Sequence, residues 1–264
     1  MNSYRVPAIV MAGGAADPQF SSATGLRHRS LLRVQDPEAG PGSPTLTMLE
    51  LAVRSLSKAR RIADLYAVTD LDVPGSAHRI ADHGGFVDNL FAGLESCRDA
   101  SCACICTADM PFLTSHAVDR FMDMALQVDA DLVYPIVRAE VCARAFPAMK
   151  RTSLATRQGR FTGGNMVLVR PAALLAARSH IEAAHAHRKS PLRLAMMLGL
   201  GVTVIVGLSV VTGAGLVSIG SLERAASRLI RATARALVSD DPAIATDVDR
   251  VEDVAAIREL QRSE

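Results

Sequence analysis

Three aspartates stand where carboxylates could bind a divalent cation. Asp109 follows the apolar run 103–107 and precedes Pro111, a pattern that predicts a buried strand ending on an acid. Asp247 and Asp249 stand at what we expect to be the end of another short strand. Mg²⁺ takes one or two carboxylates together with phosphate oxygens. We therefore expect Asp109 and one of the two later aspartates to bind Mg²⁺, although each acid alone could be a helix cap or a turn residue.

A glycine pair follows the first apolar run, residues 6–11. Because Ala12, Gly13 and Gly14 have little or no side chain, their backbone N–H groups could approach an anion closely, and a tight turn is the alternative interpretation. Neither of the two standard nucleotide-binding glycine motifs is present. Arg29 lies in a basic cluster further on, and its planar guanidinium suits phosphate oxygens. The pattern indicates a phosphate site.

Short apolar runs alternate with helical periods along the chain, which predicts parallel βαβ units. Such sheets bind ligands beyond the carboxyl ends of their strands, where the glycine pair and Asp109 fall. A second pair, Gly163-Gly164, comes just before a predicted strand. We expect strands at 6–11, 64–69, 103–107, 131–137, 165–169 and 246–249, and helices at 47–59, 89–97, 115–127, 171–186, 222–236 and 251–262.

The composition of the 264 residues fits one globular α/β domain with a large core, because 49% of them are hydrophobic. The net charge of +2 argues against a dedicated nucleic-acid binder. No signal peptide is recognisable and the five cysteines are an odd number, which favours a cytoplasmic protein. Cys102, Cys104 and Cys106 alternate, so the outer two are about 13 Å apart on a strand, too far for one zinc ion. We interpret them as core residues.

The segment 194–222 contains no charged residue. It is long enough to span a bilayer, but six glycines dilute it, and we favour a buried or membrane-touching insertion at about 192–222. Such an insertion leaves open a peripheral membrane contact and a homo-oligomer.

Five motifs in this order resemble the MobA-like nucleotidyltransferases. They are PAIVMAGGAADP, HRSLLRV, CTADMPFLT, FTGGNMVLVRP and TDVDRVEDV, and the resemblance extends from Val6 to about Arg262. It implies a Rossmann-like three-layer fold with a mostly parallel sheet, of the nucleotide-diphospho-sugar transferase type. It also implies an enzyme that binds an NTP, with GTP or CTP favoured, and Mg²⁺. A phosphorylated small-molecule acceptor would attack the α-phosphorus and release pyrophosphate.

The resemblance also implies roles for individual residues. Asp109 would bind Mg²⁺ with Asp247 or, less strongly indicated, Asp249. Basic clusters at Lys150-Arg151 and around Lys189 could receive the acceptor phosphate. The remaining expected contacts are Ala12, Gly13, Gly14, Gly84, Gly85 and Asn89 with the nucleotide, and Gly163, Gly164 and Asn165 with the acceptor.

Two departures from the family pattern affect the phosphate side of the site. Arg29 stands where the family usually has a lysine, and Asp17 follows the glycine loop in place of an arginine. A carboxylate beside a triphosphate would repel it unless it pointed away. A catalytically silent nucleotide-binding or regulatory protein on the same fold is therefore the alternative hypothesis.

Overall fold

The chain folds around a mixed sheet of mostly parallel strands, as predicted. The computed structural model describes residues 4–39, 43–186 and 214–263. The strand order is β5-β4-β1-β6-β10-β7-β9-β8, with β11 on the free edge of β7. Only β9 and β10 run against the others within this described sheet. The strands are β1 (Val6–Met11), β4 (Ile62–Val68), β5 (His78–Ile80), β6 (Ala103–Thr107), β7 (Leu132–Arg138), β8 (Leu154–Thr156), β9 (Gly159–Gly163), β10 (Met166–Val169) and β11 (Ala234–Ser239).

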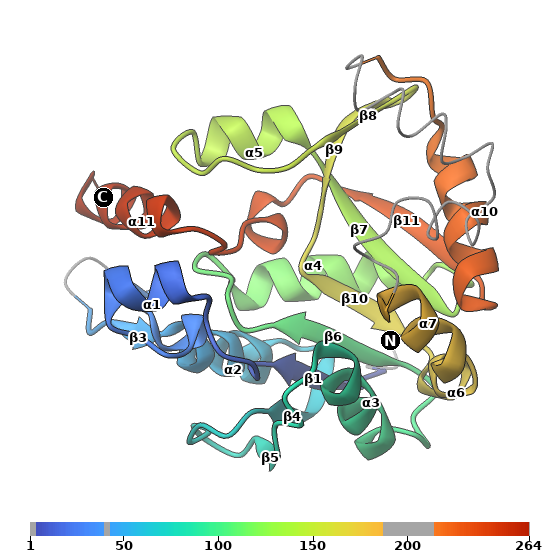
Figure 1. Cartoon of the computed structure of the whole chain (residues 1–264), viewed down its shortest axis with the longest axis horizontal. Helices are drawn as coiled ribbons and strands as arrows, with labels where there is room; N and C mark the ends of the chain where they lie inside the picture. The colour runs from blue at the N-terminus through green and yellow to red at the C-terminus, as the bar shows by residue number, and fades with distance from the viewer. Residues whose placement is uncertain (1–3, 40–42, 187–213, 264) are drawn as a thin grey trace.

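Helices cover both faces of the sheet, so that the sheet is the middle one of three layers (Figure 1). One face packs against α2 (Met48–Lys58) and α4 (Ser115–Ala125), and the other against α3 (Phe86–Ser96) and α6 (Pro171–Ala176). A third apolar cluster joins α1 (Pro18–Thr24) and α11 (Val251–Ser263) to the hairpin β2–β3 (Arg33–Val34, Leu46–Thr47). The remaining elements are α5 (Ala139–Ala145), α7 (Arg178–Ala186), α10 (Ile219–Ile230), η1 (Arg29–Leu31) and η2 (Pro242–Ala245).

The apolar pattern of the sequence explains the central strands. Cys104 and Cys106 are fully buried on the α2/α4 face, so the interpretation of these thiols as core residues is confirmed. Burial raises the pKa of the Cys104 thiol to about 12. Thr47 begins α2 as predicted, with a reciprocal hydrogen bond to Glu50 that satisfies two free N–H groups of the first turn.

Pro135 interrupts the pairing along β7. The N-terminal half of this strand pairs with β10 and its C-terminal half with β9. Because proline has no N–H group, it fits the break between these two strands. There the N–H of Gly164 donates to the carbonyl of Pro135 at 2.9 Å, and the N–H of Asn165 turns away to the carbonyl of Ile244 at 2.7 Å. The break at Pro135 thus positions Asn165.

Two predicted elements were wrong, and a third prediction falls mostly outside the described residues. Residues 222–236 do not form one helix, because α10 ends at the left-handed Arg231 and β11 follows. Residues 246–249 form an irregular segment after η2, not a strand. Most of the uncharged segment, residues 194–213, lies outside the described residues. Among those described, no helix is long and apolar enough to span a membrane.

Candidate functional site

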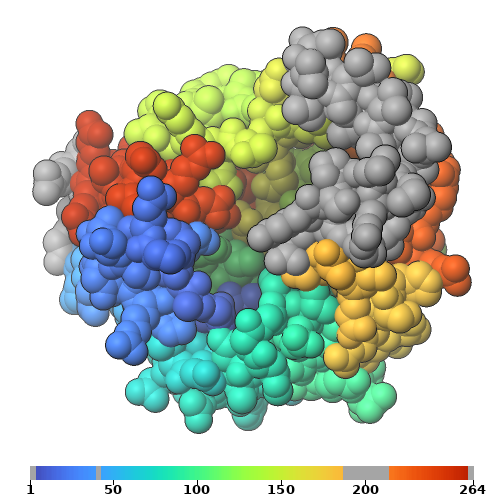
Figure 2. Space-filling view, in the orientation of Figure 1, coloured from blue at the N-terminus to red at the C-terminus, as the bar shows by residue number. Residues whose placement is uncertain are grey.

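A pocket of about 120 Å³ lies where the carboxyl ends of β1 and β6 meet. The N–H of Ala108 donates to the carbonyl of Met11 at 3.1 Å, which joins the two loops. The space-filling view shows the molecule hollowed in this central region (Figure 2). The pocket is lined by Met11, Ala12, Gly13, Gly14, Ala15, Ala16, Arg29, Ser30, Ala108 and Asp109.

Asp109 presents one buried, unsatisfied carboxylate oxygen at this pocket. Its Oδ1 is buried and accepts no hydrogen bond from the described residues. Burial raises the pKa of the Asp109 carboxyl and the negative charge of Asp249 raises it further, while the Thr107 side chain and Arg29 act in the opposite direction. A buried, unpaired acceptor next to a second acid is the environment that a cation would stabilise.

Arg29 is held between two acids. Its Nη2 lies 2.9 Å from Oδ2 of Asp17, and its Nη1 lies 3.8 Å from Oδ1 of Asp249. The other oxygen of Asp17 accepts the N–H of Phe20 at 2.9 Å and caps α1, so Asp17 is occupied by the helix and the arginine. The Nε of Arg29 is buried without a hydrogen-bond partner among the described residues.

The two C-terminal aspartates have different surroundings. The carboxylate of Asp247 forms a buried ion pair with Arg151, which also donates to the Asp247 carbonyl at 3.0 Å. Val248 donates its N–H to the Asp109 carbonyl at 3.0 Å. Asp249 is the aspartate that lies near Arg29 and acts on Asp109. At the start of the last helix, Asp253 accepts the N–H of Asp249 at 2.9 Å and that of Arg250 at 2.8 Å.

The loop of Ala12, Gly13 and Gly14, the glycine loop, is hydrogen-bonded to a carboxylate that was not predicted from the sequence. Asp82 Oδ2 accepts the N–H of Gly14 at 2.6 Å, and its Oδ1 accepts the N–H of Gly84 at 2.8 Å and the Asn89 amide at 2.7 Å. A Cβ on Gly13 would lie 2.6 Å from the Asn89 Nδ2, and Gly14 has φ = 86°. Asp82 stands shortly after the short β5, so it shows the same pattern of an acid at a strand end as Asp109.

Gly84 and Asn89 therefore bind the same Asp82 carboxylate that accepts the N–H of Gly14. The Oδ1 of Asn89 accepts the N–H of His83 at 2.7 Å, and the side chain is buried. Gly85 begins α3, and a Cβ there would lie 2.9 Å from Asp88 Oδ2. The structure links Gly84 and Asn89 to the glycine loop through Asp82, whereas Gly85 precedes α3.

The expected acceptor side lies next to Asp109 along the sheet edge. The carbonyl of Asn165 accepts the N–H of Thr107 at 3.0 Å, and the Asn165 Nδ2 is buried without a partner among the described residues. Gly164 packs tightly, because a Cβ there would lie 2.8 Å from Pro135. Lys189 lies outside the described residues, and Lys150 is exposed on a neighbouring cleft that also contains Asp17 and Asp249.

Unsatisfied buried polar atoms gather around this edge of the sheet. In the described residues, seven buried side-chain nitrogen or oxygen atoms accept or donate no hydrogen bond. One belongs to Asp36. The other six belong to Arg29, Ser30, Thr107, Asp109, Arg151 and Asn165. Since folded proteins satisfy nearly all buried polar atoms, this concentration indicates a site built for a polar ligand.

The donor set at Asp109 fits Mg²⁺. The part of the chain that the structure describes contains no cluster of three or more acidic, cysteine or histidine side chains suited to a metal. Mg²⁺ does not need such a cluster, since it takes one or two carboxylates and completes its shell with water and phosphate oxygens. Asp109, with its unpaired Oδ1, and the nearby Asp249 can supply those carboxylates.

Comparisons with known proteins agree with this geometry. A family model described as the MobA-like NTP transferase domain matches residues 8–197. A hypothetical transferase from Thermus thermophilus is 32% identical, with a TM-score of 0.78 over 95% of this chain and 99% of that one. None of the curated proteins matches the chain.

Two more distant structures share the fold. The 2-C-methyl-D-erythritol 4-phosphate cytidylyltransferase from Thermus thermophilus superposes with a TM-score of 0.54 at 14% identity, covering 98% of this chain and 99% of that one. CMP:2-keto-3-deoxy-manno-octonic acid synthetase, in complex with CTP, superposes with a TM-score of 0.52 at 10% identity over the same shares of the two chains.

Proposed function

The chain belongs to the MobA-like NTP transferase family, and from this premise we propose that it transfers a nucleoside monophosphate from an NTP to a phosphorylated small molecule. The observation that carries the proposal is the pocket where the unpaired Asp109 carboxylate faces the glycine loop and Arg29. GTP or CTP is the favoured donor, consistent with the cytidylyltransferase and the CTP complex among the structures of the same fold.

The glycine loop would bind the phosphates of the nucleotide. The N–H of Gly14 already donates to a carboxylate, Asp82, so its orientation suits an anion. Arg29 adds a cationic fork beside the loop, and its buried Nε is free of hydrogen bonds to the described residues. Asp17 and Asp249 hold that guanidinium in place, so Asp17 need not repel the triphosphate.

Asp109 and Asp249 would hold Mg²⁺, and Asp247 would act indirectly. When bound, Mg²⁺ would stabilise negative charge on the phosphate oxygens. Asp247 is occupied by Arg151, and this pair anchors the segment that carries Asp249. We therefore propose Asp249 as the second carboxylate in place of Asp247.

The reaction needs positioning and charge stabilisation more than a protein nucleophile. The acceptor's phosphate oxygen would form the new bond to the α-phosphorus as the bond to pyrophosphate breaks. Asn165 would orient the acceptor with its unpaired Nδ2. Arg29 would stabilise charge on the transferred group.

A pyrophosphate-release screen of the four NTPs with Mg²⁺ and a panel of phosphorylated acceptors tests the proposal. Turnover with one donor–acceptor pair, abolished by Asp109→Ala, is the expected result. NTP binding without turnover over the whole panel would instead support the silent nucleotide-binding protein. Two contacts favour that alternative, because they already use groups that a triphosphate would need. Asp82 accepts the N–H of Gly14, and Asp17 forms an ion pair with Arg29.

A further inference from the structure

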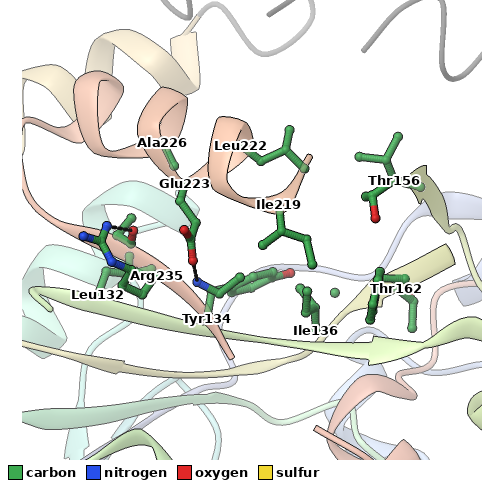
Figure 3. Close-up of a pocket in the computed structure, with 15 residues that line it drawn as sticks. Leu132, Tyr134, Ile136, Thr156, Thr162, Ile219, Leu222, Glu223, Ala226 and Arg235 are labelled. Atoms are coloured by element: carbon green, nitrogen blue, oxygen red, sulfur yellow. Dashed lines mark hydrogen bonds between the residues drawn. The ribbon is translucent and has the colours of Figure 1, made fainter. Parts of the chain in front are cut away.

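An apolar cavity of about 360 Å³ lies between α10 and the strands β7, β9 and β11. It shares no lining residue with the pocket that contains Asp109. Figure 3 shows α10 above the sheet, with Ile219 and Leu222 on the helix side and Tyr134 and Ile136 on the strand side. A cavity of this size and lining is typical of a small-molecule site.

Three polar side chains in the cavity wall already have hydrogen-bond partners in the protein. Oε1 of Glu223 accepts the N–H of Ala236 at 2.8 Å (Figure 3). Arg235 donates to the carbonyl of Ala234 at 3.0 Å, and the Thr156 hydroxyl donates to Gly159 at 2.8 Å. A polar ligand would lose its hydration in this cavity and gain few hydrogen bonds, so the walls favour hydrocarbon.

The cavity lies on the same face of the sheet as the acceptor side. Leu132 packs in the α3/α6 cluster together with Ile105 and Val167. Because side chains alternate along a strand, Thr107 and Asn165, each two residues away from a member of that cluster, lie on this face. The strands β6, β10 and β7 are neighbours in this order. Asp109 follows β6, Asn165 precedes β10, and β7 forms one wall of the cavity.

Gly163 links the cavity to the acceptor side. It lines the cavity, and a Cβ at this position would lie 2.1 Å from the Tyr134 hydroxyl, so only glycine leaves room for that ring. Gly163 is two residues from Asn165, a separation of about 7 Å in extended chain. Asn165 in turn meets Thr107 at 3.0 Å. One molecule could thus reach from the cavity to the Asp109 edge.

We propose that this cavity binds the hydrocarbon part of the phosphorylated acceptor, whose phosphate lies toward Asn165. The inference rests on the proposed function and adds the class of acceptor. The acceptor carries a phosphate at one end and an apolar chain or ring at the other.

Calorimetry of the full chain with butyl, hexyl and octyl phosphate, below the concentrations at which they form micelles, tests the inference. Affinity should rise about three- to fourfold for each methylene that enters the cavity. Ala226→Phe, which fills the cavity, should remove this dependence on chain length. Ala172→Phe, at an exposed position of α6, is the matched control and should keep it. If Ala226→Phe fails to fold, Ala226→Leu replaces it.

Affinity that does not change with chain length, or that Ala226→Phe leaves unchanged, would overturn the inference. Vesicles containing phosphatidic acid form a second arm. Binding to them that Ala226→Phe abolishes identifies a lipid source, and binding to the monomeric alkyl phosphates alone identifies a water-soluble acceptor. Chain-length-dependent binding without pyrophosphate release from any NTP would support binding in the cavity and contradict the proposed function.

Turnover that Ala226→Phe leaves unchanged would contradict the cavity site alone.

Discussion

The guanidinium of Arg29 lies 2.9 Å from the carboxylate of Asp17, and that carboxylate also begins α1 by accepting the N–H of Phe20. Asp17 therefore has two structural roles: it caps α1, and it orients the Arg29 guanidinium, which lines the pocket. An acid after the glycine loop, which by charge alone would oppose a triphosphate, is here turned toward the arginine.

Replacing Asp17 with Asn separates these two roles. Asn is as good a cap as Asp, so the stability at neutral pH should change little, whereas Asp17→Ala loses the cap as well. Loss of the ion pair should lower kcat/KM for the NTP by about tenfold, because Arg29 is less well positioned. Steady-state kinetics of both variants checks this, and full activity in Asp17→Asn would contradict a positioning role.

The same variant tests a dependence of stability on pH. The hydrogen bond from Phe20 and the contact with Arg29 hold the pKa of Asp17 below its ordinary value of 3.8. A lowered pKa in the folded state gives stability that is present above 3.8 and is lost as the pH falls through the lowered value. Asp17→Asn should therefore show a smaller loss of stability between neutral pH and acid than the parent protein. Urea unfolding at a series of pH values measures this difference.

The buried pair of Arg151 and Asp247 predicts a difference between single and double variants. Both side chains are only about one-eighth exposed, at 13% and 12%. Arg151→Ala should lower the free energy of unfolding by about 3–5 kcal/mol, because it leaves a buried charge without its partner. Arg151→Met combined with Asp247→Leu should lower it less. Urea denaturation compares the three proteins, and a double variant no more stable than Arg151→Ala would contradict the argument.

Many regular elements and the acid Asp109 at the end of β6 could be predicted from the sequence, and contacts between distant segments could not. The apolar run before Asp109 and the helical period from residue 47 are local patterns, and both elements were found in the structure. β11 was missed because its alternation is weak, and its place is set by pairing with β7. No local signal distinguishes Asp247 from Asp249 either, since Arg151, which occupies Asp247, lies 96 residues away.

Gly13→Ala should weaken NTP binding. The new Cβ would lie 2.6 Å from the Asn89 amide and 2.8 Å from Asp82, so it must displace the side chains that hold the glycine loop. We expect at least about a tenfold loss of affinity, which corresponds to about 1.4 kcal/mol. Gly220→Ala is the control, because its Cβ would meet only Arg224 at 3.6 Å and alanine is readily accommodated in the first turn of α10. Calorimetry with GTP and CTP gives both affinities, and equal effects of the two substitutions would contradict the role assigned to the loop.

Asp109→Asn should stabilise the protein while it removes activity. Burial and the charge of Asp249 raise the pKa of this carboxyl, so in the absence of a cation the ionised form opposes folding at neutral pH. Asparagine keeps the shape without the charge, and a gain of about 1 kcal/mol would raise the Tm by about 2–4 °C. Pyrophosphate release should fall to background, because the amide is a poor ligand for Mg²⁺. Adding Mg²⁺ with NTP should raise the Tm of the parent protein and not that of the variant. A variant that is less stable than the parent, or equally active, would show that Asp109 serves the fold and not the reaction.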